Sequence, residues 1–463
     1  MRAALFALSL LGLVLSGCVA DETDPEPQAP EPELETPFVD IRGLIDAERG
    51  MGEPSVGVTP EGLLFTSTNR GVYKSADLGR NWTFVGNPMT TFNADPDLVV
   101  DADGTVWYDT LYLACNEVAV SRDHGDTWNT HPAVCNGPIG DRQYIVATGG
   151  GTAYLYYHQI PTFYQTAMKT TDHGETWLPT GPVETPDHHL LVDEGSGWGG
   201  GGFHNAAAGS VFFTFTWFSD GPAGPGGWAP AFSVTRDGGA SFEVVVVAEP
   251  EGDPLGLSLV VGSADDAGNV YIAWGELLED ETVAIRMAVS TDDGRTFGEP
   301  VRLDDGNGSN VFPAIEAGAP GHVAVAYYAA DQDGHPGRLP NNATWKVELV
   351  NTTDVTNATP TFTTTDISAG PVKLGAICPN GASCQANRQF LDYFDLVRMP
   401  DGRLGAMYNT RTLPDHENET RNVFALTSGD LLGAWPPSNS NATDDPAMRA
   451  KTKAPLPFPP VRP

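Results

Sequence analysis

Carboxylates, arginines and a tyrosine recur at the starts of apolar segments that alternate with glycine-containing turns. Arginine binds carboxylates through paired hydrogen bonds, and two carboxyl groups can supply the proton donor and the base or nucleophile of glycoside cleavage. A tyrosine also becomes a nucleophile when a neighbouring base accepts its proton. The residues that we consider candidates for such chemistry are Arg49, Glu53, Asp97, Asp141, Arg142, Arg388 and Tyr393.

The same segment starts carry polar side chains that could bind a ligand without turnover. An acidic group of Asp95, Asp97, Asp141 and Asp392 suits a hard cation such as Ca²⁺, a glycan or a peptide. No spacing of cysteines and histidines predicts a metal site, so we expect no required cofactor and regard Ca²⁺ as an optional ligand. The binding candidates are Asp95, His204, Asn205, Asn310 and Asp392.

An eight-residue pattern, Ser/Thr-x-Asp-x-Gly-x-x-Trp/Phe, occurs five times, and we call each copy an octad. Successive octad aspartates are separated by 46, 49, 65 and 55 residues, a period typical of propeller blades. The pattern predicts a hairpin turn in which Asp accepts backbone N–H groups, Gly adopts a positive φ and the aromatic ring fills the space between adjacent sheets. The aspartates concerned are Asp77, Asp123, Asp172, Asp237 and Asp292.

A second repeat, a strand followed by a glycine turn and an apolar strand, occurs seven times. It predicts an all-β, seven-bladed β-propeller with four-stranded antiparallel blades over residues 38–435, with six blades as the alternative. The last two units lack a regular octad, and the last also lacks an outer strand. We expect residues 38–42 to supply that strand and so to close the ring, which removes the exposed sheet edges.

The octad resembles the Asp box, or BNR repeat, of sialidase-type β-propellers. The resemblance implies that the octad aspartates are structural and that the active site lies at the central mouth, where three arginines bind the substrate carboxylate. It assigns these roles to Arg49, Arg142 and Arg388 for the arginines, Tyr393 for the nucleophile with Glu53 beside it, and Asp97 or Asp141 for the acid. The family's Phe/Tyr-Arg-Ile-Pro segment is absent, and Arg142 or Arg388 could instead neutralise Asp141 or Asp392. A propeller that binds glycan or protein without catalysis is the alternative.

Residues 1–17 resemble a prokaryotic lipoprotein signal peptide. A cationic start precedes an apolar run too short to span a bilayer, and Leu-Ser-Gly-Cys ends at Cys18. The resemblance implies cleavage before Cys18 and lipid attachment to its sulfur, with the protein outside the cytoplasm and anchored to the cell envelope. We predict that residues 18–37 form an acidic, Pro-rich linker behind the lipid and that residues 436–463 form a Pro-rich disordered tail.

The other four cysteines indicate disulfides, and the charge of the chain limits the partners that it can bind. An even number of cysteines outside the cytoplasm predicts disulfides. Of three possible pairings we favour Cys115 with Cys135 and Cys378 with Cys384, because each pair is close in sequence. The chain has 60 acidic and 25 basic residues and a net charge of −35, which argues against nucleic-acid binding. We expect a monomer that contacts membrane lipid through Cys18 and a glycan or a surface protein through its mouth.

Overall fold

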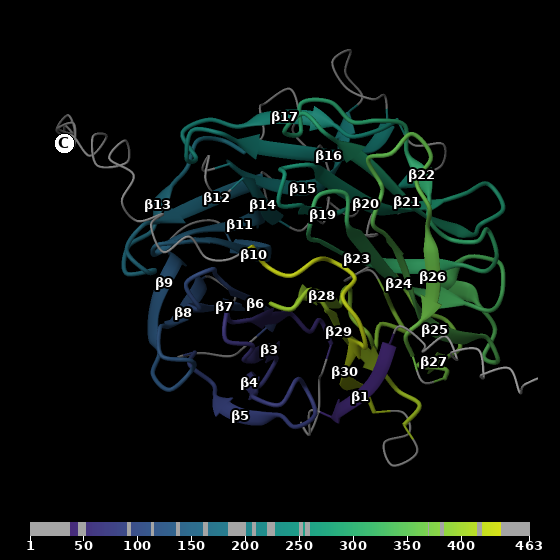
Figure 1. Ribbon diagram of the computed structural model, residues 1–463, viewed down its shortest axis with the longest axis horizontal. Helices are drawn as coiled ribbons and strands as arrows, with labels where there is room; N and C mark the ends of the chain where they lie inside the picture. Colours follow the sequence, from purple (N-terminus) through teal and green to yellow (C-terminus); the bar gives the residue numbers. More distant parts are fainter. Residues whose placement is uncertain are drawn as a thin grey trace, which may run out of the picture. The chain divides into compact units, whose positions relative to one another are not determined.

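In the computed structural model, the described residues consist mainly of β-strands joined by turns. The residues that it describes are 38–44, 52–89, 94–112, 115–135, 139–160, 165–183, 201–205, 210–219, 227–249, 253–254, 260–368, 370–379, 384–413 and 419–436. Their strands form seven separate antiparallel sheets arranged around a centre (Figure 1). The protein is therefore an all-β, seven-bladed β-propeller, as the repeats predict.

Blades I to III follow one another along the chain, each numbered from its innermost strand outward. Blade I consists of β2 (Val56–Val58), β3 (Leu64–Thr68), β4 (Gly71–Ser75) and β5 (Thr83–Gly86). Blade II consists of β6 (Ala94–Val100), β7 (Val106–Tyr112), β8 (Cys115–Ser121) and β9 (Asn129–Cys135). Blade III consists of β10 (Ile139–Gly149), β11 (Thr152–Ile160), β12 (Gln165–Thr170) and β13 (Leu178–Pro179).

Blades IV to VI repeat this order, and two of them carry one additional short strand. Blade IV consists of β14 (Gly201–Asn205), β15 (Ser210–Ser219), β16 (Gly227–Thr235) and β17 (Glu243–Val246). Blade V consists of β18 (Asp253–Pro254), β19 (Val261–Ala264), β20 (Val270–Leu277), β21 (Val283–Ser290) and β22 (Val301–Arg302). Blade VI consists of β23 (Asn310–Ala317), β24 (Val323–Ala330), β25 (Thr344–Thr352), β26 (Thr363–Asp366) and β27 (Lys373–Leu374), with a 3₁₀ turn at Pro336–Arg338.

Blade VII combines the two ends of the propeller. Its inner strands are β28 (Asp395–Arg398), β29 (Leu404–Thr410) and β30 (Arg421–Thr427), and its outermost strand is β1 (Phe38–Leu44). The antiparallel register places Phe38 opposite Thr427 and Leu44 opposite Val423. This confirms the predicted closure of the ring by the N-terminal strand.

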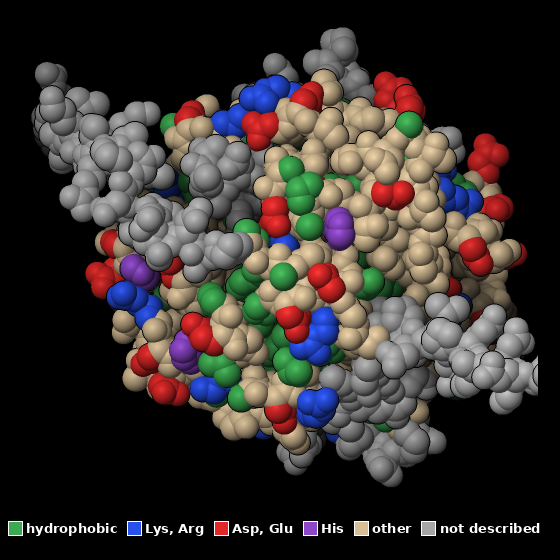
Figure 2. Space-filling model, in the orientation of Figure 1, with side chains coloured by type: hydrophobic (Ala, Val, Ile, Leu, Met, Phe, Trp, Pro, Cys, Tyr) green, Lys and Arg blue, Asp and Glu red, His purple; other side chains and the backbone are tan. Residues whose placement is uncertain are grey.

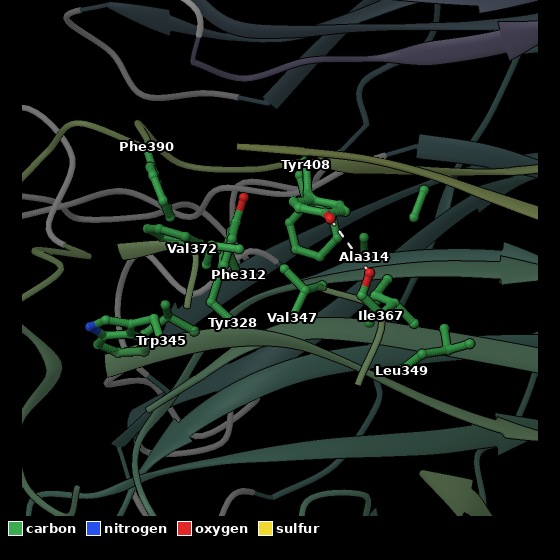
Figure 3. Packing of buried hydrophobic residues seen from close by; sticks show 14 of the residues in the cluster. Phe312, Ala314, Tyr328, Trp345, Val347, Leu349, Ile367, Val372, Phe390 and Tyr408 are labelled. Carbon is green, nitrogen blue, oxygen red and sulfur yellow. Dashed lines mark hydrogen bonds between the residues drawn. The ribbon is translucent and has the colours of Figure 1, made fainter. Parts of the chain in front are cut away.

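Some central strands are apolar along their whole length, as expected where neighbouring blades cover both of their faces. Every residue of β24, Val-Ala-Val-Ala-Tyr-Tyr-Ala-Ala, is buried, so the polar alternation of a half-exposed strand is absent. Between blades VI and VII, Tyr328 packs against Phe390 and Phe394 with ring centroids 4.9 Å away in each case. Figure 3 shows Phe312, Trp345 and Tyr408 in the same cluster.

Each octad joins the third and fourth strands of blades I to V through the same local hydrogen bonds. In blade II the Ser121 hydroxyl donates to Asp123 (2.9 Å) and accepts from Gly125 N–H (2.8 Å), and Thr127 N–H donates to Asp123 (2.8 Å). Gly125 has a φ of 84°, which favours glycine. Hydrogen bonds from Thr127 lower the pKa of Asp123 to about 2.

The octad aromatic ring packs against the preceding blade. The Trp82 ring lies 5.8 Å from that of Phe424 in blade VII, and the Phe297 ring lies 5.5 Å from that of Phe232 in blade IV. Blade VI keeps part of the octad, since the Thr352 hydroxyl donates to Asp354 at 2.7 Å. The octads therefore join neighbouring blades, at the turns of the sheets and away from the inner strands.

The structure bears on both predicted disulfides. Cys378 and Cys384 are bonded to each other, which confirms that pairing. Cys115 and Cys135 lie directly opposite each other in the β8 and β9 ladder, while their side chains are outside the described part of the structure. The second disulfide stays a prediction that the backbone register favours.

We predict that the propeller loses stability when β1 is removed. In a chain starting at residue 45, the edge of β30 has no partner strand, and each backbone hydrogen bond lost lowers the free energy of unfolding by about 1 kcal/mol. The same edge becomes exposed to intermolecular pairing. A chain starting at residue 37 keeps β1 and is the matched control. Thermal unfolding and light scattering should show a lower Tm and aggregation only for the shorter chain; equal Tm values would contradict closure by β1.

Candidate functional site

The candidate residues gather where the innermost strands begin, and we call this end of the ring the mouth. The opposite end is covered by residues 428–436, drawn in yellow across the centre of Figure 1. The Arg398 guanidinium lies there and donates to the carbonyls of Gly433 (2.8 Å) and Ala434 (2.9 Å). It also forms a two-pronged ion pair with Asp266, both distances being 2.9 Å. This ion pair links blade VII to blade V.

Three of the inner strands start with the same backbone kink. Glu53, Asp95 and Phe312 have φ values of 56°, 44° and 56°, and each is followed by proline in the sequence. A residue before proline normally stays extended, and a left-handed conformation costs a non-glycine residue about 1–3 kcal/mol. The kink thus recurs in blades I, II and VI as a built feature of the mouth.

Tyr393 lies beside two predicted site residues, Glu53 and Asp97. Burial raises the pKa of Tyr393 well above its usual value, and the charges of Glu53 and Asp97 raise it further. The Tyr393 hydroxyl donates to the carbonyl of Pro96 at 2.7 Å, and its ring lies 6.0 Å from that of Tyr144. The structure therefore brings together a tyrosine and the two carboxyl groups that the sequence analysis grouped with it.

Asp97 connects three blades through hydrogen bonds. Its carboxylate accepts from the Ser55 hydroxyl in blade I (2.9 Å), from Leu98 N–H in its own strand (2.8 Å) and from Ile145 N–H in blade III (2.8 Å). Burial raises the pKa of Asp97 and these hydrogen bonds oppose the increase. The side chain is 6% exposed, so it forms part of the wall of the mouth.

Asp395 plays the corresponding part where the ring closes. Its carboxylate accepts from Val56 N–H in blade I (2.9 Å) and from Leu396 N–H (2.8 Å). Burial raises the pKa of Asp395 to about 7, and the charge of Asp97 contributes. Acidic side chains on the innermost strands thus bind the backbone of the next blade as well as facing the centre.

The arginines are not brought into a common site within the described residues. Arg388 forms an ion pair with Asp392 at 2.6 Å, and Asp392 is buried. Arg49 and the side chain of Arg142 lie outside the described residues. The only predicted arginine whose side chain is described is therefore already engaged with a carboxylate.

The other predicted residues divide into described and undescribed ones. Asn310 is buried and donates to the carbonyl of Val283 at 3.0 Å, and the carbonyl of Asp95 accepts from the Gln143 side chain. The side chains of Asp141, His204 and Asn205 lie outside the described part of the structure, as does Cys18. The predictions for those four residues stay untested.

Sequence reasoning missed Asp109, which lies in β7 directly opposite Asp97. Asp109 is fully buried, and neither of its carboxylate oxygens has a hydrogen-bond partner among the described residues. Burial raises its pKa well above the usual value, and the charge of Asp97 raises it further. The nearby N–H of Thr110 lowers this pKa, although it is not in hydrogen-bond geometry. One signal was available, since Asp109 is an acid inside the otherwise uncharged strand Val-Trp-Tyr-Asp-Thr-Leu-Tyr.

The described residues contain no group of three or more His, Cys, Asp or Glu arranged to hold a metal ion. Among these residues there is also no helix of the length and apolar character needed to cross a membrane. On the face seen in Figure 2, acidic side chains are spread over the blades with Lys and Arg among them.

No protein-family model matches the sequence, and no curated protein matches it. Similar solved structures include an ulvan lyase from a polysaccharide lyase family, which is 12% identical with a TM-score of 0.50, over 85% of this chain and 97% of that one. An intramolecular trans-sialidase from Ruminococcus gnavus is 14% identical with a TM-score of 0.42, over 84% and 96% of the two chains. A protein of unknown function from Dyadobacter fermentans is 13% identical with a TM-score of 0.45, over 84% and 99%. At these identities the likeness concerns the propeller fold.

We predict that Asp97→Ala destabilises the propeller strongly. It leaves the Ser55 hydroxyl and two backbone N–H groups without their acceptor, and each buried group left unpaired costs about 1–3 kcal/mol. Asp97→Asn keeps one acceptor oxygen and should cost less. Urea unfolding measures both, with the exposed Asp126→Ala as the control; an unchanged midpoint for Asp97→Ala would show that Asp97 does not join the blades.

Proposed function

We propose that the protein acts on glycans at the mouth and that Glu53, Asp97 and Tyr393 carry the reaction. The observation that supports this most directly is the position of the buried Tyr393 hydroxyl, which donates to the carbonyl of Pro96, the neighbour of Asp97, at 2.7 Å. Burial, and then the charges of Glu53 and Asp97, raise its pKa. Carboxyl groups around one small volume are what glycosidic bond cleavage requires. The octads, interpreted as Asp boxes of the sialidase type, then form the scaffold of the site.

The three residues take separate roles in this proposal. Asp97 delivers a proton to the leaving oxygen, since burial raises the pKa of this carboxyl group towards the range of a general acid. Tyr393 is the nucleophile and Glu53 accepts its proton. This base is needed because burial disfavours the tyrosinate.

The substrate class is proposed only as a glycan. Recognition of a sialic acid carboxylate would use Arg49, Arg142 and Arg388, and the last of these is held by Asp392. Release of Arg388 from that ion pair would have to accompany substrate binding.

A second candidate function is binding without turnover. It is favoured by the hydrogen bonds that already engage the catalytic candidates, since Asp97 accepts three and the Tyr393 hydroxyl donates to Pro96. The ligand in that case would be a glycan, a surface protein or Ca²⁺.

We also propose that the protein is anchored outside the cytoplasm by lipid on Cys18. This rests on the position of the Leu-Ser-Gly-Cys motif at the end of the apolar run and on the acidic, Pro-rich residues behind it, which suit an extended spacer.

We predict that a screen with a fluorogenic sialoside, arabinan and a uronate-containing polysaccharide yields product from at least one substrate. Tyr393→Phe, Glu53→Gln and Asp97→Asn should each lower kcat by about 10²-fold or more, the usual effect of losing a proton-transfer group. The octad variant Asp292→Asn, remote from the mouth, should leave kcat unchanged. Binding without product would favour the second candidate, and full activity in all three mouth variants would refute the assigned site.

We predict that the full-length protein expressed in a bacterium incorporates labelled fatty acid and partitions into detergent, and that Cys18→Ala abolishes both. Mass spectrometry of the mature N-terminus should find lipid-modified Cys18. The variant Cys18→Ala should keep the thermal stability of the propeller, because Cys18 precedes the first strand of the propeller by twenty residues in the sequence. An unmodified N-terminus at another residue would contradict the anchoring.

A further inference from the structure

Asp97 and Asp109 form a pair of facing carboxyl groups in the wall of the mouth. They are direct partners in the antiparallel ladder of β6 and β7, and the Cβ atoms of such partners are about 4.5–5.5 Å apart on the same face of the sheet. Both side chains are buried, with exposures of 6% and 0%. Two carboxylates this close in a dry environment cannot both be ionised at low cost.

The surroundings of the two carboxyl groups are unequal. Asp97 accepts hydrogen bonds from the Ser55 hydroxyl and from two backbone N–H groups, which stabilise a negative charge. Asp109 has no donor on either oxygen among the described residues. A protonated Asp109 avoids an uncompensated buried charge and gains a hydroxyl that can donate toward Asp97.

Among the described residues, the groups packed around the pair supply no compensating positive charge. No described lysine or arginine forms an ion pair with Asp97 or Asp109, and the side chains of Asp141, Arg142 and His158 lie outside the described residues. The titratable side chains on the surrounding elements are Glu53, Asp95, Tyr144, Tyr393 and Asp395. In the same blade, Glu117 lies on the other face of β8, and His131 in β9 is paired with Val118, the β8 partner of Asp109.

We propose that Asp97 and Asp109 share a single proton at neutral pH, with Asp109 as the proton-holding partner of the acid at the mouth. Asp109 is a positioning residue, because it acts through Asp97 and is itself fully buried. The protonation of the pair stands on the strand register and on the unequal hydrogen bonding; its use in cleavage rests on the proposed function. A cation between the two groups is the competing arrangement, but Asp97 has already committed both oxygens to donors, and Asp109 alone offers too few ligands.

The variant Asp109→Asn tests the proposal, because it has nearly the same shape as the protonated acid and cannot ionise. In the proposed state Asp109 is protonated in the folded protein, whereas it ionises in the unfolded chain above a pKa of about 3.9. The free energy of unfolding should therefore fall as the pH rises above that value. Between pH 5 and 7 the unfolding equilibrium constant of the wild type should rise by up to about tenfold per pH unit more than that of Asp109→Asn. Asp395 and Glu316, whose pKa values are raised to about 7 and about 8, titrate in both proteins and cancel in the comparison.

Urea unfolding at several pH values measures this difference, and Asp126→Asn, an exposed aspartate of the same blade, should retain the wild-type pH dependence. Infrared difference spectra at pH 7 should show a protonated carboxyl C=O band that Asp109→Asn lacks. Asp395 and Glu316 also hold protons near this pH, so the band is assigned in a protein that carries Asp395→Asn and Glu316→Gln, and its presence there decides the question if Asp109→Asn does not fold. Equal pH slopes and no such band would overturn the proposal. The proposal would also be overturned if added Ca²⁺ stabilised the wild type and Asp109→Asn abolished that stabilisation, since the pair would then hold a cation. Neither readout uses turnover, so a failed glycan screen with a positive band would reject the function and keep the shared proton.

Discussion

The structure depends on each blade being covered on both faces by its neighbours. This requirement favours strands that are apolar from end to end, as in β24, and concentrates polar side chains at strand starts and connections, with Asp109 inside β7 as an exception. It also requires a complete ring, because a missing outer strand would expose both a sheet edge and the apolar faces beside it. The ring is completed because β1, the first strand in the sequence, pairs with β30 as the outermost strand of the last blade.

The same constraint gives the acidic residues of the mouth two tasks. An inner-strand carboxylate that enters the wall must satisfy its oxygens, and the backbone N–H groups of the next blade are within reach. Asp395 binds Val56 N–H across the closure, and Asp97 binds Ile145 N–H of blade III. Residues that could do chemistry are thereby held rigidly, which suits preorganised catalysis, and their removal affects stability as well as function.

The sequence was sufficient for the fold and for part of the site. Octad spacing and the seven strand repeats depend on local turn chemistry and apolar patterning, so blade number and the closing strand followed directly. The grouping of Glu53, Asp97 and Tyr393 followed from assigning strand starts to one end of the ring. Asp109 was missed because its importance comes from lying opposite Asp97, and such a pairing depends on strand register. The pairing of Arg388 with Asp392 was one of two roles that the residue types left open, and side-chain positions were needed to decide between this ion pair and an arginine available to a substrate.

The elements that define this fold and the elements that would perform its chemistry place independent demands on the sequence. An octad needs only a hydroxyl, an aspartate, a glycine and an aromatic ring within eight residues, and its hydrogen bonds close within the turn. Packing between blades needs apolar side chains of suitable volume. Neither demand restricts Glu53, Tyr393 or Asp109, so a common propeller at 12% identity to an ulvan lyase is compatible with a different reaction. Any ligand or substrate of this protein must therefore be sought from its own mouth residues, and the proposed shared proton of Asp97 and Asp109 is a property of that mouth that a purely structural wall does not need.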